Sequence, residues 1–198
     1  AGVGIGPPME SGGVPPFETE DALAGTTYAW HTPDDGEVSW WIQTQAETAG
    51  RTGLAMQVRP SGFRWEEPLR APGLHYEVEV SEAGAYRVWL LVSFQDDRDD
   101  SCVIALDGIP QPVDAQFSRG SLCTYGARQA WIWAHLSDVD ISEGTHTFSI
   151  HARESGLRID RVYLTIGDEM PPVDALWLPS TRGTVTTHTD ALARAPRS

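Results

Sequence analysis

Apolar residues alternate with polar ones along most of this chain, and this period of two limits its fold more than any other feature. In the stretch LHYEVEV, the apolar residues Tyr76, Val78 and Val80 alternate with two glutamates. Successive side chains of a β-strand point to opposite faces, so this pattern is typical of a strand with one buried face. No stretch keeps a helical period over the roughly ten residues that a helix requires. The sequence therefore predicts an all-β protein.

Nine segments carry β-branched and aromatic residues, mostly in this alternation, and turn signals such as PDDG, EAG, DG, SEG and ESG separate them. They are residues 26–31, 37–43, 53–60, 74–80, 84–94, 101–108, 129–141, 144–152 and 157–166. A tenth strand is expected in FETEDAL, at residues 17–23. So many short strands predict an antiparallel β-sandwich, or jelly roll, over residues 17–167. The Gly/Pro-rich residues 1–16 are interpreted as an arm or linker, and residues 168–198 as a C-terminal extension.

The alternation changes phase in the last of these segments, LRIDRVYLTI. Leu157 and Ile159 share one parity, whereas the apolar residues from Val162 onward share the other. A strand whose buried set changes parity needs an extra residue, so we expect a β-bulge at Asp160-Arg161. A carboxylate at that position requires an explanation.

The charge of the chain excludes some classes of partner. The formal net charge is −14, and the sequence contains neither Lys nor Asn. A strongly acidic surface disfavours binding to nucleic acid and to anionic membranes. No segment approaches the ~20 apolar residues of a membrane-spanning helix.

The predicted first strand carries two carboxylates on one face. Glu18 and Glu20 are two residues apart, so their side chains repel unless both are solvated or a cation lies between them. Oxygen ligands without His or Cys suit Ca²⁺, and Asp160 at the expected bulge is the best candidate for a third ligand.

Four motifs occur in order: FETEDA, AGAYRVWLLV, DDSCVIALDG and GTHTFSIHARESGLRIDRVYL. Together they resemble the calcium-binding β-sandwich carbohydrate-binding modules of families six and thirty-five, which are galactose-binding-like jelly rolls. The resemblance spans about residues 17–166. It implies a structural Ca²⁺ held by the opening ExE pair and the closing IDxVxL aspartate, which are Glu18, Glu20 and Asp160 here.

The resemblance also implies a sugar site in loops at one end of the sandwich. The aromatic residues expected to stack on sugar rings are Trp65, which we expect to be exposed, together with Tyr125 and Trp131. Trp131 and Trp133 share a parity, so they face one side, and this pair can equally belong to the core. Polar contacts are expected from Arg98, Arg153 and Glu154. The family site commonly uses an Asn, which this chain lacks; an Arg could instead bind the carboxylate of a uronic acid.

Two cysteines, Cys102 and Cys123, allow one disulfide. Forming it would contribute roughly 3 kcal/mol in the loop-entropy model. It would also indicate a secreted, extracellular location. The alternative is a pair of reduced thiols in the core.

No catalytic motif is present: there is no GxSxG, HExxH or P-loop. We therefore expect a non-catalytic module that binds a polysaccharide or a glycan end, either attached to a parent enzyme or free. The alternative is a structural subunit of an extracellular assembly, such as a sheath, fibre or surface layer, in which residues 1–16 and 168–198 pack on neighbouring subunits.

Overall fold

The structure is a computed structural model, and it describes residues 2–5, 27–31, 40–48, 51–59, 64–67, 71, 73–112, 131–172 and 181–182. This part of the chain contains strands and no helix, and so no helix able to cross a membrane. In chain order the strands are β1 (Val3–Ile5), β2 (Thr27–His31), β3 (Trp40–Thr48), β4 (Arg51–Arg59), β5 (Gly73–Val80), β6 (Gly84–Ser93), β7 (Cys102–Leu106), β8 (Ile109–Pro110), β9 (Ile132–Ile141), β10 (Gly144–Ala152), β11 (Arg158–Ile166) and β12 (Thr181–Arg182).

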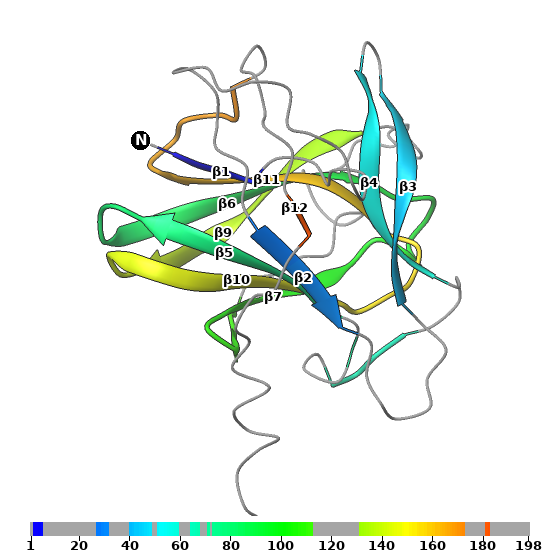
Figure 1. Ribbon diagram of the computed structural model, residues 1–198, viewed down its shortest axis with the longest axis horizontal. Coiled ribbons are helices and arrows are strands. Elements are labelled where there is room, and N and C mark those ends of the chain that lie inside the picture. The colour runs from blue at the N-terminus through cyan, green and yellow to red at the C-terminus, as the bar shows by residue number, and fades with distance from the viewer. Residues whose placement is uncertain are drawn as a thin grey trace, which may run out of the picture.

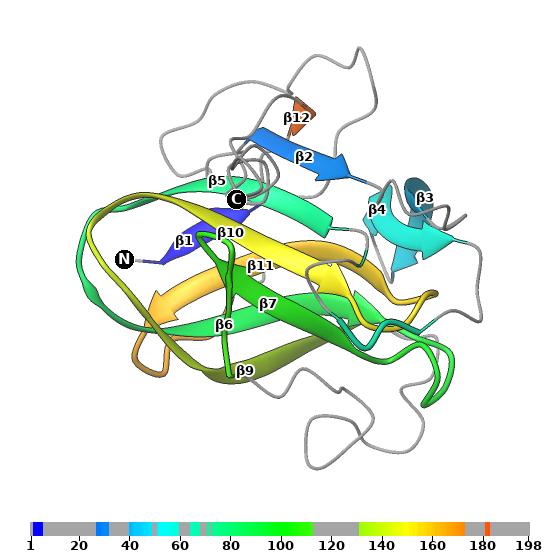
Figure 2. The same cartoon turned by 90° about the horizontal axis from the view of Figure 1, so that it is seen from below.

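The strands form two six-stranded sheets that pack face to face (Figure 1 and Figure 2). The first sheet, called here the β11 sheet, has the order β3-β4-β11-β6-β9, with β1 also pairing with β11. The second, called the β10 sheet, has the order β12-β2-β5-β10-β7-β8. Every described pair is antiparallel except β12 with β2. The predicted antiparallel β-sandwich is therefore confirmed.

Each of the nine predicted strand segments overlaps an observed strand, whereas the predicted strand at 17–23 lies outside the described residues. One of the turn signals can be checked in detail. Between β7 and β8, Asp107 has a φ of 50° and Gly108 a φ of 79°. Two central residues with positive φ match the twist of a two-residue hairpin, which is why the pair Asp-Gly is favoured there.

One hydrophobic core fills the space between the sheets, and the strands supply alternate residues to it. Tyr76 and Val78 of β5 face inward, as do Ile104 of β7 and both Phe148 and Ile150 of β10. Fully burying an apolar side chain of this size stabilises the fold by about 1.5–3 kcal/mol relative to leaving it exposed. The buried face predicted for residues 74–80 is confirmed.

The predicted bulge is present in β11. Ile159 pairs with Val92 of β6 and Arg161 pairs with Leu91, so Asp160 is the extra residue between two adjacent pairs. The extra residue lets Ile159 and the later apolar residues of β11 face the core despite their opposite parity.

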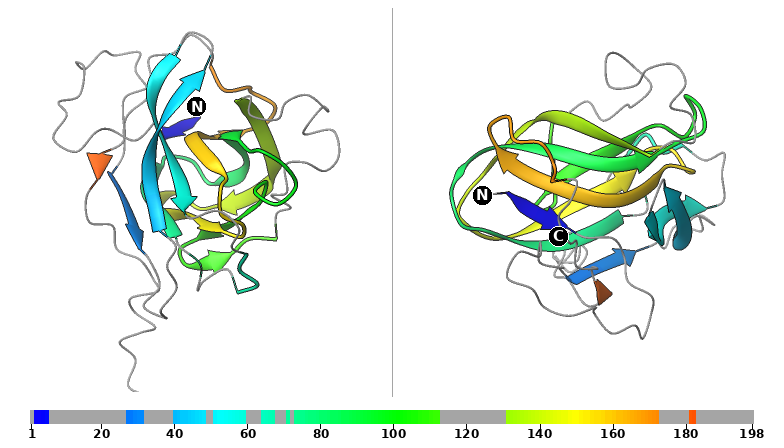
Figure 3. Two further views of the ribbon diagram at one scale, coloured as in Figure 1. Left: turned by 90° about the vertical axis from the view of Figure 1, so that its right-hand side faces the viewer. Right: turned by 90° about the horizontal axis from the view of Figure 1, so that it is seen from above.

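The described residues near the two chain ends pair with this sandwich. Val3 of β1 lies opposite Leu164 of β11, and Thr181 of β12 lies opposite Thr27 of β2. Val3–Ile5 thus adds a short strand within the segment predicted as an arm. In Figure 3 the β3–β4 hairpin lies along one side of the sandwich and reaches beyond the other strands of the β11 sheet.

Candidate functional site

The outer face of the β11 sheet, which points away from the core, carries a row of aromatic side chains. The register places Tyr163 of β11 opposite Trp89 of β6, and Trp89 opposite His135 of β9. Trp133 precedes His135 by two residues and therefore shares its face. Inward neighbours such as Leu90 belong to the core, so the alternation of each strand forces these aromatic residues outward.

These side chains pack against one another while remaining open to solvent at one edge. Trp89 and Tyr163 are buried, Trp133 is half-buried against them, and His135 is exposed. The ring centroids of Trp89 and His135 are 5.1 Å apart, with the planes tilted by 58°. The Trp89 indole Nε1 is buried and has no hydrogen-bond partner among the described residues. A buried donor without a partner costs free energy.

A third indole lies at the loop end of the same face. Trp131 immediately precedes β9 and is half-buried. The guanidinium carbon of Arg158 lies 5.6 Å from the centroid of its ring, within the range of a cation–π interaction. The Arg158 Nη2 also donates a 2.6 Å hydrogen bond to the Ser93 hydroxyl on β6. Both contacts fix the guanidinium beside the indole.

Charged groups border the opposite end of the row. The Arg87 guanidinium donates hydrogen bonds to Asp168 at 2.6 Å and to Asp138 at 3.3 Å, and the bond to Asp168 is the main reason that the pKa of Arg87 is raised. Burial raises the pKa of the Tyr163 hydroxyl, and the negative charge of Glu169 raises it further. The row therefore ends in a mixed polar rim with both acceptors and donors.

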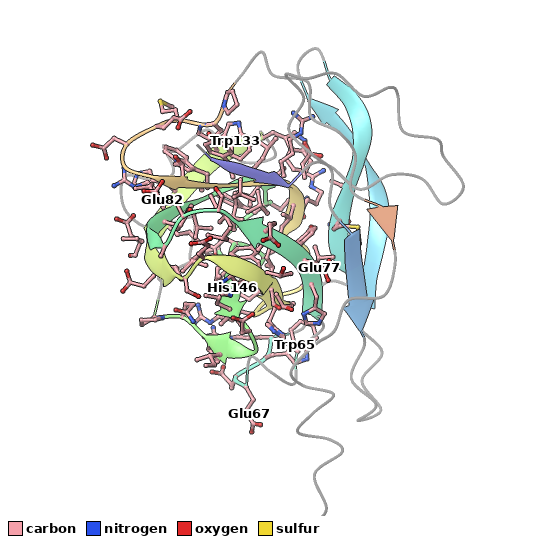
Figure 4. All side chains as sticks on the ribbon, turned by 60° about the vertical axis from the view of Figure 1, so that its left-hand side comes forward. Trp65, Glu67, Glu77, Glu82, Trp133 and His146 are labelled. Atoms are coloured by element: carbon pink, nitrogen blue, oxygen red, sulfur yellow. The ribbon has the colours of Figure 1, made fainter. Side chains whose placement is uncertain are left out.

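The indole of Trp65 is buried, so the expectation that it is exposed was wrong. It is 6% exposed and belongs to the main core. Its backbone N–H donates a 2.8 Å hydrogen bond to the carbonyl of Arg153, which pins this loop to the turn after β10. The adjacent charged residues Glu66 and Glu67 remain exposed, and Figure 4 shows Glu67 pointing away from the molecule and Trp65 well separated from Trp133. Charged neighbours in the sequence could not show which way the indole turns.

The other predicted sugar-binding residues differ in their exposure. Arg98 is exposed, Arg153 is half-buried, and Tyr125 lies outside the described residues. Glu154 is only 4% exposed, and its Oε2 accepts a 2.7 Å hydrogen bond from the Ser101 hydroxyl. In this structure Glu154 holds protein segments together instead of facing a ligand.

A family model described as the glycosyl hydrolase family 115 C-terminal domain matches residues 27–173, which covers nearly all of the sandwich described above. The chain belongs to this family. No curated protein sequence matches it.

Several solved structures are similar to this family 115 C-terminal domain. A family 35 carbohydrate-binding module from Clostridium thermocellum has 12% identity and a TM-score of 0.48, covering 71% of this chain and 92% of that one. The C-terminal CBM6 of a laminarinase from Zobellia galactanivorans has 14% identity and a TM-score of 0.45, covering 70% of this chain and 99% of that one. A family 6 module of a Cellvibrio mixtus lichenase, in complex with cellotriose, has 15% identity and a TM-score of 0.42. The match covers 65% of this chain and 88% of that one. The chain spans only 18% of another match, a ruminal GH26 endo-β-1,4-mannanase.

The calcium ligands expected in this family 115 domain are only partly described. Asp160 is 5% exposed at the bulge, and its Oδ2 lies 3.2 Å from Nε of Arg161. Glu18 and Glu20 lie outside the described residues. Within the described ranges, no three His, Cys, Asp or Glu residues gather closely enough to hold a metal ion.

The Cys102 thiol is free, so the predicted disulfide with Cys123 is not formed in this structure. Cys102 is 3% exposed and faces the core in the same inward set as Ile104. Burial raises the pKa of this thiol far above the ordinary range. Cys123 lies outside the described residues.

An Asp–His–Ser arrangement at the turn end of the domain has a structural explanation. The Nδ1 of His146 lies 2.7 Å from Oδ2 of Asp107, and its Nε2 lies 3.2 Å from the Ser142 hydroxyl. The same Nε2 is only 2.9 Å from the Ser142 carbonyl oxygen, which requires a hydrogen on that nitrogen. A protonated Nε2 cannot accept the serine proton, so the histidine clamps two turns together and does not act as a general base in this geometry.

Sequence reasoning overlooked four members of the outer face: Trp89, His135, Arg158 and Tyr163. The signal for Trp89 was present, because Trp89 alternates with the inward residues of β6. The partners of Trp89 depend on the pairing of β6 with β9 and β11, which no local pattern reveals.

Proposed function

We propose that this family 115 C-terminal domain is a non-catalytic carbohydrate-binding domain, and that its ligand lies on the outer face of the β11 sheet. The observation that carries the proposal is the pair of half-buried indoles, Trp131 and Trp133, at alternate positions on one face. Sugar rings stack their apolar C–H faces on such indoles. Arg158, whose guanidinium lies beside the Trp131 ring, supplies hydrogen-bond donors for sugar oxygens.

The physical character of this face favours a modest affinity. Trp89 and Tyr163 are buried, and the indoles of Trp131 and Trp133 are only partly exposed, so few sugar hydroxyls would gain more from protein contacts than they lose in water. The net charge of −14 disfavours polyanionic chains. A neutral polysaccharide is therefore the expected ligand, or a chain whose uronic end pairs with an arginine such as Arg158, Arg98 or Arg153.

A structural Ca²⁺ held by Glu18, Glu20 and Asp160 forms part of this proposal. Its support within the described residues is the Asp160 carboxylate, which is 5% exposed at the bulge of the last long strand. Burying a carboxylate is costly unless cationic groups or hydrogen bonds offset the loss of water. The half-buried Arg161 guanidinium supplies one such group, and the proposed ion would supply another.

We also propose that the domain works outside the cell, attached to a family 115 glycoside hydrolase that acts on the bound polysaccharide. The extracellular location follows from the proposed ligand, since polysaccharides of this kind lie outside the cell. The disulfide argument no longer supports it, because Cys102 is free.

The experiment is a binding panel of soluble neutral polysaccharides, measured by affinity electrophoresis and isothermal titration. Trp131→Ala and Trp133→Ala should each weaken binding to the best ligand by about tenfold or more, equivalent to ~1.4 kcal/mol. Ile109→Ala is the matched control, because Ile109 is 66% exposed on β8 in the other sheet. Circular dichroism and melting temperature would check that each variant folds.

Two outcomes would contradict the proposal in different ways. If the wild-type protein binds no glycan of the panel, carbohydrate binding itself is wrong. If it binds one and both Trp variants bind equally well, the site lies elsewhere, and the loop end would be the next region to test.

A further inference from the structure

The solvent-accessible aromatic side chains of the β11 sheet lie along a single strand. β9 is the last strand in the order of this sheet (Figure 2). Along its outward row Trp131 and Trp133 are half-buried and His135 is exposed. We call these three residues the β9 track. The outward side chains beside them on β6 are almost completely buried, and they are Ser93, Leu91 and Trp89.

The next strand inward, β11, is buried on this face as well. Tyr163 and Thr165 are 2% and 1% exposed. The half-buried Arg158 reaches the track only at its loop end, where the guanidinium lies beside the Trp131 ring. A ligand on this face therefore meets a strip one side chain wide, and not a flat plane of rings.

The strip is long and its middle is held in place. Residues on one face of an antiparallel strand repeat about every 6.8 Å, so Trp131 and His135 are roughly 13 Å apart along the chain. Trp133 packs against Trp89 and Tyr163, and the His135 ring centroid lies 5.1 Å from that of Trp89. The rings are thus ordered before a ligand arrives, which lowers the entropic cost of binding.

A β-bulge ends the track at the turn side. His135 lies opposite Trp89 and Asp138 lies opposite Arg87, so β9 uses three steps where β6 uses two. Beyond this extra residue the outward side chains of β9 are carboxylates. The first of them, Asp138, binds Arg87 at 3.3 Å, and Arg87 also binds Asp168 at 2.6 Å. An ion-pair cluster therefore replaces the aromatic rings.

Charge and width together select the kind of ligand. The three outward positions of the track carry no carboxylate, although the net charge of the chain is −14. A neutral ligand is therefore not repelled by the track itself. A strip one side chain wide offers far less than the ~800 Å² that each partner contributes to a stable protein–protein interface. A slender neutral chain of successive rings fits both conditions.

We propose that the β9 track binds one extended, linear chain of neutral sugars that runs parallel to β9; this rests on the carbohydrate-binding function proposed above. Successive sugar rings stack on Trp131, Trp133 and His135. A single sugar contacts one ring of the track, and each further sugar adds a contact until the chain reaches the bulge. Sugars beyond that point add nothing. The flat surface of a crystalline polysaccharide does not fit, because only one strand presents rings to it.

The first test is isothermal titration with oligosaccharides of increasing length, from the monosaccharide to the hexasaccharide. The series is that of the panel polysaccharide which the wild type binds best, for example the xylo- or manno-oligosaccharides. Affinity should rise by about tenfold or more and then become constant once the track is covered. Equal affinity for the monosaccharide and the hexasaccharide would overturn the proposal, because the site would then hold a single sugar.

The second test shortens the track at its far end. His135→Ala should weaken binding of the hexasaccharide by about threefold and leave the disaccharide unchanged, since the disaccharide is covered by Trp131 and Trp133. His135→Phe keeps a ring and should retain the wild-type affinity. Asp140→Ala is the matched control, because Asp140 is exposed on β9 beyond the bulge. An unchanged hexasaccharide affinity in His135→Ala, or an equal loss for both lengths, would contradict the track.

The third test asks whether the ligand is a single chain, by sedimenting the protein with crystalline cellulose. The wild type should stay in solution. Sedimentation that is lost in Trp131→Ala and Trp133→Ala would overturn the proposal, because the track would then bind a flat surface. These outcomes differ from a failure of the proposed function: if no polysaccharide of the panel binds, carbohydrate binding itself is wrong, whereas binding without the expected dependence on length contradicts only the track.

Discussion

The guanidinium carbon of Arg158 lies 5.6 Å from the centre of the Trp131 ring, while its Nη2 donates to the hydroxyl of Ser93 at 2.6 Å. The two contacts join three strand ends of the β11 sheet: the start of β11, the end of β6 and the start of β9. They hold the Trp131 indole at a fixed angle on the outer face, where a sugar ring can stack without first ordering the side chain.

Replacing Arg158 tests this relationship. Arg158→Gln should weaken glycan binding by about two- to fivefold, since an exposed cation–π contact is worth roughly 0.5–1 kcal/mol. Arg158→Lys keeps the charge but loses the planar stacking, so it should retain part of the affinity. Isothermal titration against the best polysaccharide of the panel measures both. Equal affinity in Arg158→Gln and wild type would remove Arg158 from the site.

Removing calcium should destabilise the domain. An ion that binds only the folded state at about one hundred times its Kd raises stability by ~2.7 kcal/mol. Excess EDTA should therefore lower the melting temperature by several degrees, and added CaCl₂ should restore it. Asp160→Asn should reduce the difference between the two conditions, because it removes one charged ligand. A wild-type melting temperature that does not respond to EDTA would contradict the proposed ion.

Gly156→Ala should destabilise the loop end. Gly156 has a φ of 116°, and a Cβ added there would lie 2.8 Å from the Cβ of Asp99. Backbone strain and this overlap should together cost about 2 kcal/mol or more, a fall in melting temperature of roughly 4–8 °C. Gly144→Ala is the matched control: its φ is 126°, but no atom lies within 4 Å of the added carbon. It should therefore lose less, and equal losses would mean that the contact with Asp99 is unimportant.

The Cys102 thiol should be unreactive in the folded protein. Its side chain is buried in the core, and burial raises its pKa, so little thiolate exists at neutral pH. In the Cys123→Ala variant, a chromogenic thiol reagent should detect about one thiol per chain only after unfolding in guanidinium. Wild-type protein purified without reductant should yield two thiols on unfolding. If the unfolded wild type yields no free thiol, the two cysteines form a disulfide after all.

The fold could be predicted because its signals are local. Period-two alternation located the strands, and the change of parity between Ile159 and Val162 located the bulge that the pairing of β11 with β6 confirms. Each of these signals depends only on the direction in which neighbouring residues of one strand point. That direction is fixed by the backbone geometry of any strand, whatever packs against it.

The candidate site could be predicted only in part, because its members come from separate strands. The sequence places Trp131 and Trp133 on one face, but it does not show that Tyr163 and Arg158 of β11 share that face with Trp89 of β6. This depends on which strands pair and in which register. Pairing is decided by the packing of both sheets around the whole core.

Trp65 and Cys102 show most clearly which features of this protein cannot be predicted from its sequence. The sequence by itself determined an acidic antiparallel sandwich with a bulge at Asp160, since charge and alternation are properties of the chain alone. Only the tertiary structure decided that Trp65 turns inward and that Cys102 packs in the core as a free thiol. The contacts that fix them, such as the hydrogen bond from Trp65 to Arg153, join residues far apart in the chain. A local pattern holds no information about which distant segment will cover a side chain.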